Sequence, residues 1–323
     1  SIDEKDCNKL YNKGVNKLKT SFFSFKFSPD YLGAVDEFTS AAKGYRKLGL
    51  SNKSITSYQK AIECHHNLND FWAEGNCNLG IAEIYLFDLK NSDKGIEFLK
   101  KANYCYQVSG KFSYGIKSIV TVAEKFMENK DYETAEKILK EAFNICAENT
   151  EDKLIGGTFE QIFNKLLDVE CGMMKWAESI NLAQKYVEAQ LKYPEKDNYR
   201  INKTYMKLCI LRIINGEDYL CDDIFMKMFN SRYEDTSTDI GDIKKLMDSI
   251  KNLDKKNFTY CVSSAFTLFE NNLLKGLQVL YKKREEEAKE GGNKIENNVE
   301  NNKGENNNII NTSSNTGNKN AID

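Results

Sequence analysis

The sequence predicts an all-α protein: a tetratricopeptide-like solenoid of helical hairpins followed by a C-terminal helical bundle. Three observations support this prediction. The apolar residues follow a helical period almost everywhere, and the 323 residues include only 2 prolines, which would interrupt helices. The alternation typical of half-buried strands is missing. We therefore expect about thirteen or fourteen helices and no strand.

A pattern of small and large residues at helical spacing recurs along the chain. Small residues let neighbouring helices approach closely, and large residues fill the space between them. The copies that begin at positions 54, 95, 135 and 179 lie about 40 residues apart, which fits one helical hairpin per repeat. The pattern occurs in Ala34–Phe38–Ala41, Ser54–Tyr58–Ala61, Gly95–Leu99–Ala102, Ala135–Leu139–Ala142 and, more weakly, Ser179–Ala183–Tyr186.

Short breaks rich in Asn, Asp and Ser separate the expected helices. These residue types cap helices, because their side chains accept hydrogen bonds from free backbone N–H groups. The breaks fall at residues 68–70, 91–93, 109–111, 129–131 and 149–151.

The sequence divides into three expected parts: a solenoid over residues 1–220, a helical bundle over 221–290 and a tail over 291–323. Within the bundle we expect a loop at 231–238 and helices at 241–251 and 257–283. The Asn-rich tail has too few apolar residues to offset the entropy of ordering, so we expect it to be disordered.

Composition argues against several classes of protein. The formal net charge of -2 gives no overall attraction to nucleic acid. The 9 cysteines are scattered and odd in number, which is typical of buried thiols in a reducing compartment. No segment has the roughly 18 to 20 apolar residues of a membrane span, and the charged N-terminal segment does not resemble a signal peptide. A cytoplasmic protein is expected.

Catalytic and metal-binding signals are weak. His65 and His66 are adjacent, so on a helix they point about 100° apart and cannot chelate one metal together in the usual way. Gly156-Gly157 lacks the preceding strand and the surrounding pattern of a phosphate-binding loop. We therefore expect a protein that binds other proteins, with no catalytic residue, no metal and no cofactor.

A cluster of phenylalanines before Pro29 and Asp30 is the most unusual feature of the sequence. One interpretation is that these rings cap the core of the first repeat. The other is an exposed loop that enters a membrane surface or contacts a partner, with weak and reversible binding. The phenylalanines are Phe22, Phe23, Phe25 and Phe27, and the nearby lysines that would favour anionic lipid are Lys13, Lys17, Lys19 and Lys26.

The end of the expected bundle combines leucines with a run of charges. Leu277 and Leu280 precede a basic run and then Glu285, Glu286 and Glu287. This segment is either an ordinary terminal helix with ion pairs at i,i+4 or a charged tip that a partner contacts.

These features together resemble the soluble NSF attachment proteins (SNAPs), and the gamma form more closely than the alpha form. The resemblance is clearest through residues 28–31 and 34–42, and it covers roughly residues 5–285. It implies an adaptor that associates peripherally with membranes, binds a SNARE four-helix bundle and recruits the hexameric ATPase NSF. Phe22, Phe23, Phe25 and Phe27 match the membrane-attachment loop of the family. Leu277, Leu280 and Glu285 to Glu287 lie where the family contacts NSF.

Mid-chain lysines are candidates for contact with the acidic surface of a SNARE bundle, since opposite charges set register and association rate. The alternative is a solvated lysine face. A competing function is a tetratricopeptide-like scaffold that holds an extended peptide in its groove, for which the phenylalanine loop has no use. The candidate lysines are Lys111, Lys117, Lys125 and Lys130.

Overall fold

The computed structural model describes residues 3–21, 25–150 and 156–290. The chain forms two compact units, one of residues 1–173 with 184–196 and one of 174–183 with 197–323. This division precedes the expected boundary at residue 220, because α10 (Asn198–Ile214) packs against α11 (Cys221–Asn230) and α12 (Thr236–Lys251). The described residues are helical with no strand, as predicted. The predicted disorder of 291–323 lies outside them.

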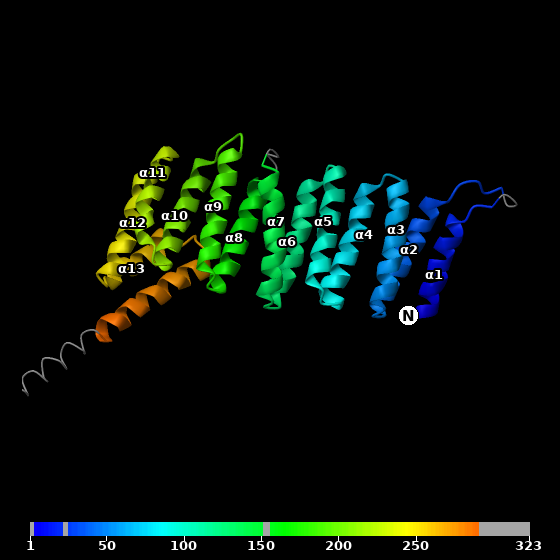
Figure 1. Ribbon diagram of the computed structural model, residues 1–323, viewed down its shortest axis with the longest axis horizontal. Coiled ribbons are helices and arrows are strands. Elements are labelled where there is room, and N and C mark those ends of the chain that lie inside the picture. Colours follow the sequence, from blue (N-terminus) through cyan, green and yellow to red (C-terminus); the bar gives the residue numbers. More distant parts are fainter. Residues whose placement is uncertain (1–2, 22–24, 151–155, 291–323) are drawn as a thin grey trace, which may run out of the picture. The chain divides into compact units, whose positions relative to one another are not determined.

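The first unit is a series of antiparallel helices that follow one another in chain order (Figure 1). Most have 17 residues, and α4 ends in a π-helical turn, Ile84–Asp88. The helices are α1 (Glu4–Leu18), α2 (Tyr31–Lys47), α3 (Ser51–Asn67), α4 (Phe71–Glu83), α5 (Ser92–Val108), α6 (Phe112–Glu128), α7 (Tyr132–Glu148) and α8 (Gly156–Gly172); α9 (Trp176–Lys192) contributes residues to both units.

The connections between α2 and α7 share one design. Each has three residues, and the middle one is left-handed: Gly49, Asn69, Lys90, Gly110 or Lys130, with φ between 54° and 73°. A left-handed residue ends a helix and turns the chain into the next one. The side chains of Asp70, Asn91 and Asp131 cap α4, α5 and α7. The predicted breaks at 68–70, 109–111 and 129–131 are confirmed, whereas the break expected at 91–93 lies at 89–91, because α5 begins at Ser92.

The π turn at the end of α4 absorbs one extra residue. Helices α3 to α7 begin at residues 51, 71, 92, 112 and 132, so only the step from α4 to α5 is 21 residues, while the others are 20. A π turn inserts one residue into a helix without breaking it. Gly95 then packs so closely on Leu86 that a Cβ atom would lie 2.3 Å from Leu86 Cγ.

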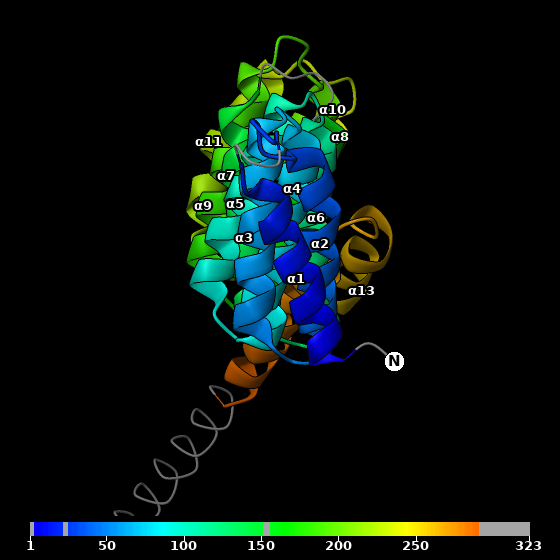
Figure 2. The same ribbon diagram turned by 90° about the vertical axis from the view of Figure 1, so that its right-hand side faces the viewer.

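The helices of the first unit form two layers. Figure 2 shows α2, α4, α6 and α8 on one side and α3, α5 and α7 on the other. Ion pairs link successive helices within each layer: Arg46 to Glu83 at 2.8 Å and Lys165 to Glu124 at 2.9 Å in the first, and Lys100 to Glu141 at 2.9 Å in the second. The recurring small and large residues found in the sequence lie buried between the layers.

The second unit contains two corrections to the sequence analysis. Helix α12 begins at Thr236, so the predicted loop ends at residue 235 and the predicted helix 241–251 begins five residues early. The predicted continuous helix 257–283 is wrong. It is divided into α13 (Lys255–Tyr260), a π turn (Cys261–Ala265), a turn and a last helix over 271–290. The break lets both Phe266 and Leu273 reach full burial.

Buried ion pairs tie the elements of the second unit together. Lys203 of α10 donates to Asp239 of α12 at 2.8 Å, and Asn202 joins the same carboxylate. Lys207, one turn further on, lies 2.6 Å from Glu270 at the start of the last helix. Charges removed from water require close partners, so these contacts position α10, α12 and the last helix.

Candidate functional site

The phenylalanine segment is a short hairpin between α1 and α2. Ser21 and Lys26 exchange two backbone hydrogen bonds, of 2.9 and 3.0 Å, which close the hairpin. Phe25 adopts a positive φ of 53° at its tip. Phe22 and Phe23 lie outside the described residues. Helix α2 begins at Tyr31, and Asp30 is its N-cap: the Asp30 carboxylate accepts a hydrogen bond from Gly33 N at 2.8 Å.

The hairpin presents apolar side chains to the solvent. Phe25 is 82% exposed and Phe27 is 68% exposed, and their rings meet edge to face at 6.3 Å. Leu32, in the first turn of α2, is 73% exposed. For these two phenylalanines the structure favours the exposed interpretation over the core cap. Sequence analysis missed Leu32. The sequence does contain a signal for it, because Leu32 is a large apolar residue that falls outside the buried stripe of its helix.

Lysines near the hairpin hold it to the helices rather than facing the solvent freely. The Lys26 ammonium donates to the backbone carbonyls of Asn16, at 3.3 Å, and Lys17, so it satisfies the C-terminal end of α1. Lys17 donates in turn to Gly33 O at 2.9 Å. Lys19 donates to the Asn16 side chain at 3.0 Å. These hydrogen bonds fix the positions of the three ammonium groups and leave their positive charges in place, because carbonyl and amide oxygens are neutral acceptors.

Glu37 forms ion pairs with two lysines at the base of the hairpin. It is 8% exposed, and its carboxylate accepts from Lys13 and from Lys17. The hydrogen bond from Lys13, supported by that from Lys17, lowers the pKa of Glu37 despite its burial. The carboxylate therefore stays ionised and fixes α1 against α2 at the base of the hairpin.

The structure separates the four mid-chain lysines. Lys111 precedes α6 and Lys130 follows it, so about 28 Å of helix axis lies between them. Lys125 is bound to Glu83 at 3.2 Å and lies over the Phe87 ring. Lys117 is exposed on α6, and no ion pair of the described residues includes it. The set is a line along one helix and not a cluster.

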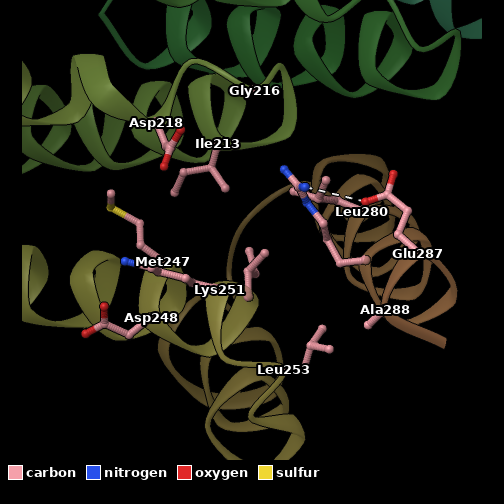
Figure 3. A pocket seen from close by; sticks show the side chains of 12 residues that line it. Ile213, Gly216, Asp218, Met247, Asp248, Lys251, Leu253, Leu280, Glu287 and Ala288 are labelled. Carbon is pink, nitrogen blue, oxygen red and sulfur yellow. Dashed lines mark hydrogen bonds and ion pairs between the residues drawn. The ribbon is translucent and has the colours of Figure 1, made fainter. Parts of the chain in front are cut away.

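Residues of the last helix divide between the core and the surface. Leu277 is fully buried, so its side chain cannot reach a partner in this arrangement. Leu280 and Glu287 line a cavity of about 760 Å³ within the second unit, where Arg284 pairs with Glu287 (Figure 3). Glu286 is exposed and Glu285 is partly exposed.

The histidines and cysteines differ in their exposure to solvent. His65 is buried, which lowers its pKa by desolvation, and His66 is exposed. The cysteines are all free and buried, and burial raises the pKa of Cys146 to about 12, so its thiol stays protonated. Among the described residues no group of three or more His, Cys, Asp or Glu side chains is placed to hold a metal ion. None of the described helices is both long and apolar enough to cross a membrane.

The described residues define an all-α, tetratricopeptide-like hairpin-repeat protein. A sequence model of the soluble NSF attachment protein family matches residues 5–269, and the chain belongs to that family. The expected family is thus confirmed.

Two curated relatives are soluble NSF attachment protein homologs of Fowlpox virus (strain NVSL). FPV011 is 27% identical over 110 residues, 34% of this chain and 39% of the viral protein. FPV033 is 25% identical over 133 residues, 41% of this chain and 46% of the viral protein. The chain thus spans less than half the length of these relatives.

Two solved structures show a weak similarity to this chain at low sequence identity. BtubC (BKLC) from P. vanneervenii is 15% identical, with a TM-score of 0.33, over 71% of this chain and 90% of the other. Pseudomonas aeruginosa PilF is 14% identical, with a TM-score of 0.30, over 80% and 99%. The assignment therefore depends on the family match.

Proposed function

We propose that this protein is an adaptor that binds a SNARE four-helix bundle, recruits the ATPase NSF and associates peripherally with a membrane. The observation that carries the proposal is the exposed hairpin of Phe25 and Phe27, in a chain whose residues 5–269 match the SNAP family. A protein that only held peptides in solution would have no use for two exposed rings on a hairpin. The gamma-type assignment is part of the same proposal.

The hairpin would supply weak membrane attachment. Full burial of an apolar side chain contributes on the order of 1.5 to 3 kcal/mol, so partial insertion of two rings and Leu32 gives reversible binding. Lys13 and Lys17 share the carboxylate of Glu37, so the positive charge that remains near the hairpin adds an attraction to anionic lipid to the apolar insertion. Phe22 and Phe23 adjoin the same tip in sequence and belong to the proposed surface.

Binding of the two protein partners is assigned to different parts of the chain. Lys111, Lys117, Lys125 and Lys130 remain the candidates for the SNARE bundle, with Lys117 the most available. The exposed end of the last helix, with Leu280 and Glu285 to Glu287, remains the candidate for NSF. The engagement of Leu277 in the core makes it a residue that supports this helix. No catalytic step is assigned to this chain.

The competing peptide scaffold would hold its peptide on the side of the first unit where α3, α5 and α7 lie, away from the lysines of α6. A hollow of about 670 Å³ lies there, lined by residues of α3, α4 and α5. Its Lys100 and Lys101 are already paired, with Glu141 at 2.9 Å and Glu97 at 2.6 Å. A groove whose cations are neutralised offers little to an acidic peptide, so this function is the weaker candidate.

The proposed function is tested by mixing the protein with an assembled SNARE bundle, NSF and ATP, and measuring disassembly with and without the chain. Disassembly that requires the chain is the expected result. Binding of the bundle without disassembly would contradict the NSF role of the last helix. Absence of any binding would overturn the adaptor function.

A further inference from the structure

Two exposed aromatic side chains from separate helices meet on the α2/α4/α6 layer of the first unit. The rings of Trp72, in the first turn of α4, and Tyr114, in the first turn of α6, lie 4.6 Å apart. Trp72 is 36% exposed and Tyr114 is 45% exposed. Tryptophan and tyrosine are the residue types that most often carry the energy of protein interfaces.

The pair is held rigidly from below. Tyr106, fully buried, contacts Trp72 at 5.2 Å and Tyr114 at 5.1 Å, and its hydroxyl donates to Asn76 at 2.8 Å. Gly75 makes room for this ring, because a Cβ atom there would lie 2.8 Å from Tyr106 Cε1. Rings that are already fixed lose little conformational entropy when a partner binds them.

The aromatic pair begins a straight surface that we name the α4–α6 stripe: Trp72, Asn76, Tyr114, Lys117, Thr121 and Lys125. These residues are exposed and lie at helical spacing on two neighbouring helices of one layer (Figure 2). At the other end of the stripe, Lys125 of α6 forms an ion pair with Glu83 of α4 at 3.2 Å, which links the two helices. From Tyr114 to Lys125 the stripe is about 17 Å long.

The stripe has a surplus of positive charge. Two carboxylates on α4 and α6 between its ends are in ion pairs, Glu83 with Arg46 and Glu124 with Lys165. Glu74 contacts the imidazole of His66 at 3.3 Å and is the one acidic group there whose charge no Lys or Arg of the described residues pairs. Lys117 is in no ion pair of the described residues, and neither is the neighbouring Lys111. An acidic partner would be attracted to the end of the stripe that also carries the two rings.

We propose that Trp72 and Tyr114 are the apolar anchors by which the α4–α6 stripe binds an acidic helical bundle, an inference that rests on the proposed adaptor function. The partner would place an apolar side chain against the ring pair and a carboxylate about one turn further along its helix, against Lys117. The backbone N–H and C=O groups of the stripe are used within helices, so it has no edge to which an extended peptide could add. A straight, rigid, helical partner fits this surface.

The experiment measures binding of an assembled SNARE bundle to the full chain and to W72A/Y114A. The matched control is Tyr104→Ala, which removes a tyrosine that is 63% exposed on α5, in the opposite layer. Loss of the two anchors is expected to weaken binding by at least about tenfold, with Y104A unchanged. Circular dichroism checks that the variants keep their helices, and Y114A alone serves if the double variant does not fold.

A second measurement leaves the stripe intact. The chain has 2 tryptophans, so W176F leaves Trp72 as the only indole. Bundle binding should then protect Trp72 fluorescence from acrylamide. If W176F binds the bundle with Trp72 still accessible, and W72A/Y114A binds like the wild type, the inference is overturned and the adaptor function stands. Equal binding of an unfolded acidic SNARE chain would also overturn the inference. A wild-type chain that binds no bundle overturns both.

Discussion

The ammonium nitrogen of Lys17 lies 3.3 Å from a carboxylate oxygen of Glu37, and this contact joins α1 to α2 beneath the phenylalanine hairpin. The same ammonium donates to Gly33 O at 2.9 Å, and Lys13 also binds the carboxylate. Glu37 is therefore a structural residue, and the stability of the hairpin's base should depend on its ionisation.

We expect Glu37→Gln to destabilise the protein at neutral pH by about 1 kcal/mol, because the hydrogen bonds from two lysines lose their charged acceptor. The folded-state pKa of Glu37 is lowered. Its contribution is therefore present above the unfolded pKa and is lost as the pH falls through the folded value. Urea denaturation between about pH 7 and about pH 3 should show a smaller loss for E37Q than for the wild type. Glu128→Gln, on the exposed end of α6, is the control; equal pH profiles for all three proteins would contradict the prediction.

Replacing Phe25 and Phe27 by serine should weaken binding to vesicles by at least about tenfold, since two apolar side chains leave the inserted surface. The thermal midpoint should stay the same, because both rings are largely exposed. Phe229→Ser, on α11, makes the same substitution at another exposed position. Vesicle flotation measures the binding. If F229S weakens it as much as F25S/F27S, the hairpin has no special role.

Reversing the charge of Lys117 should reduce SNARE-bundle binding, and the effect should be larger at low salt because exposed charges are screened. Lys137→Glu, at an exposed position of α7 in the opposite layer, is the matched control. Binding is measured by titration at two ionic strengths. Lys125→Glu gives a less direct test, because it also breaks the contact with Glu83. No effect of K117E at low salt would move the binding face elsewhere.

Lys207→Met should destabilise the second unit by about 3 to 5 kcal/mol, because Glu270 would be left as an uncompensated buried charge. The side chains of this pair are only 9% and 7% exposed. Replacing both partners, as in K207M/E270L, should cost clearly less than K207M alone. Urea denaturation of the three proteins makes the comparison. If K207M and K207M/E270L lose the same free energy of unfolding, the destabilisation comes from poor packing of the methionine and not from the unpaired charge of Glu270.

Removal of residues 291–323 should leave the helical signal of the rest of the chain intact, since the segment has too few apolar residues to form a core. Circular dichroism of the truncated and full chains, compared per molecule, measures this. A large loss of helical ellipticity would contradict the predicted disorder.

The sequence alone was sufficient for the features that local chemistry controls. Capping residues such as Asp70 and Asp131 marked helix starts, because their side chains bind backbone groups three residues away. The small and large residues of the repeat, such as Ala135 and Leu139, were correctly placed in the core by helical period. For the phenylalanine segment the sequence left a core cap and an exposed loop open, and the exposure of Phe25 and Phe27 is seen only in the structure.

Only the tertiary structure decided what depends on neighbours far apart in the chain. Lys117 and Lys125 look alike in the sequence, yet Glu83 of another helix binds one and leaves the other available. Trp72 and Tyr114 meet only because the hairpins place α4 beside α6 in one layer. The break after α13 follows from the burial of Phe266 and Leu273. Periodicity reports which face of a helix is apolar, whereas packing against other helices decides which groups on the opposite face come together.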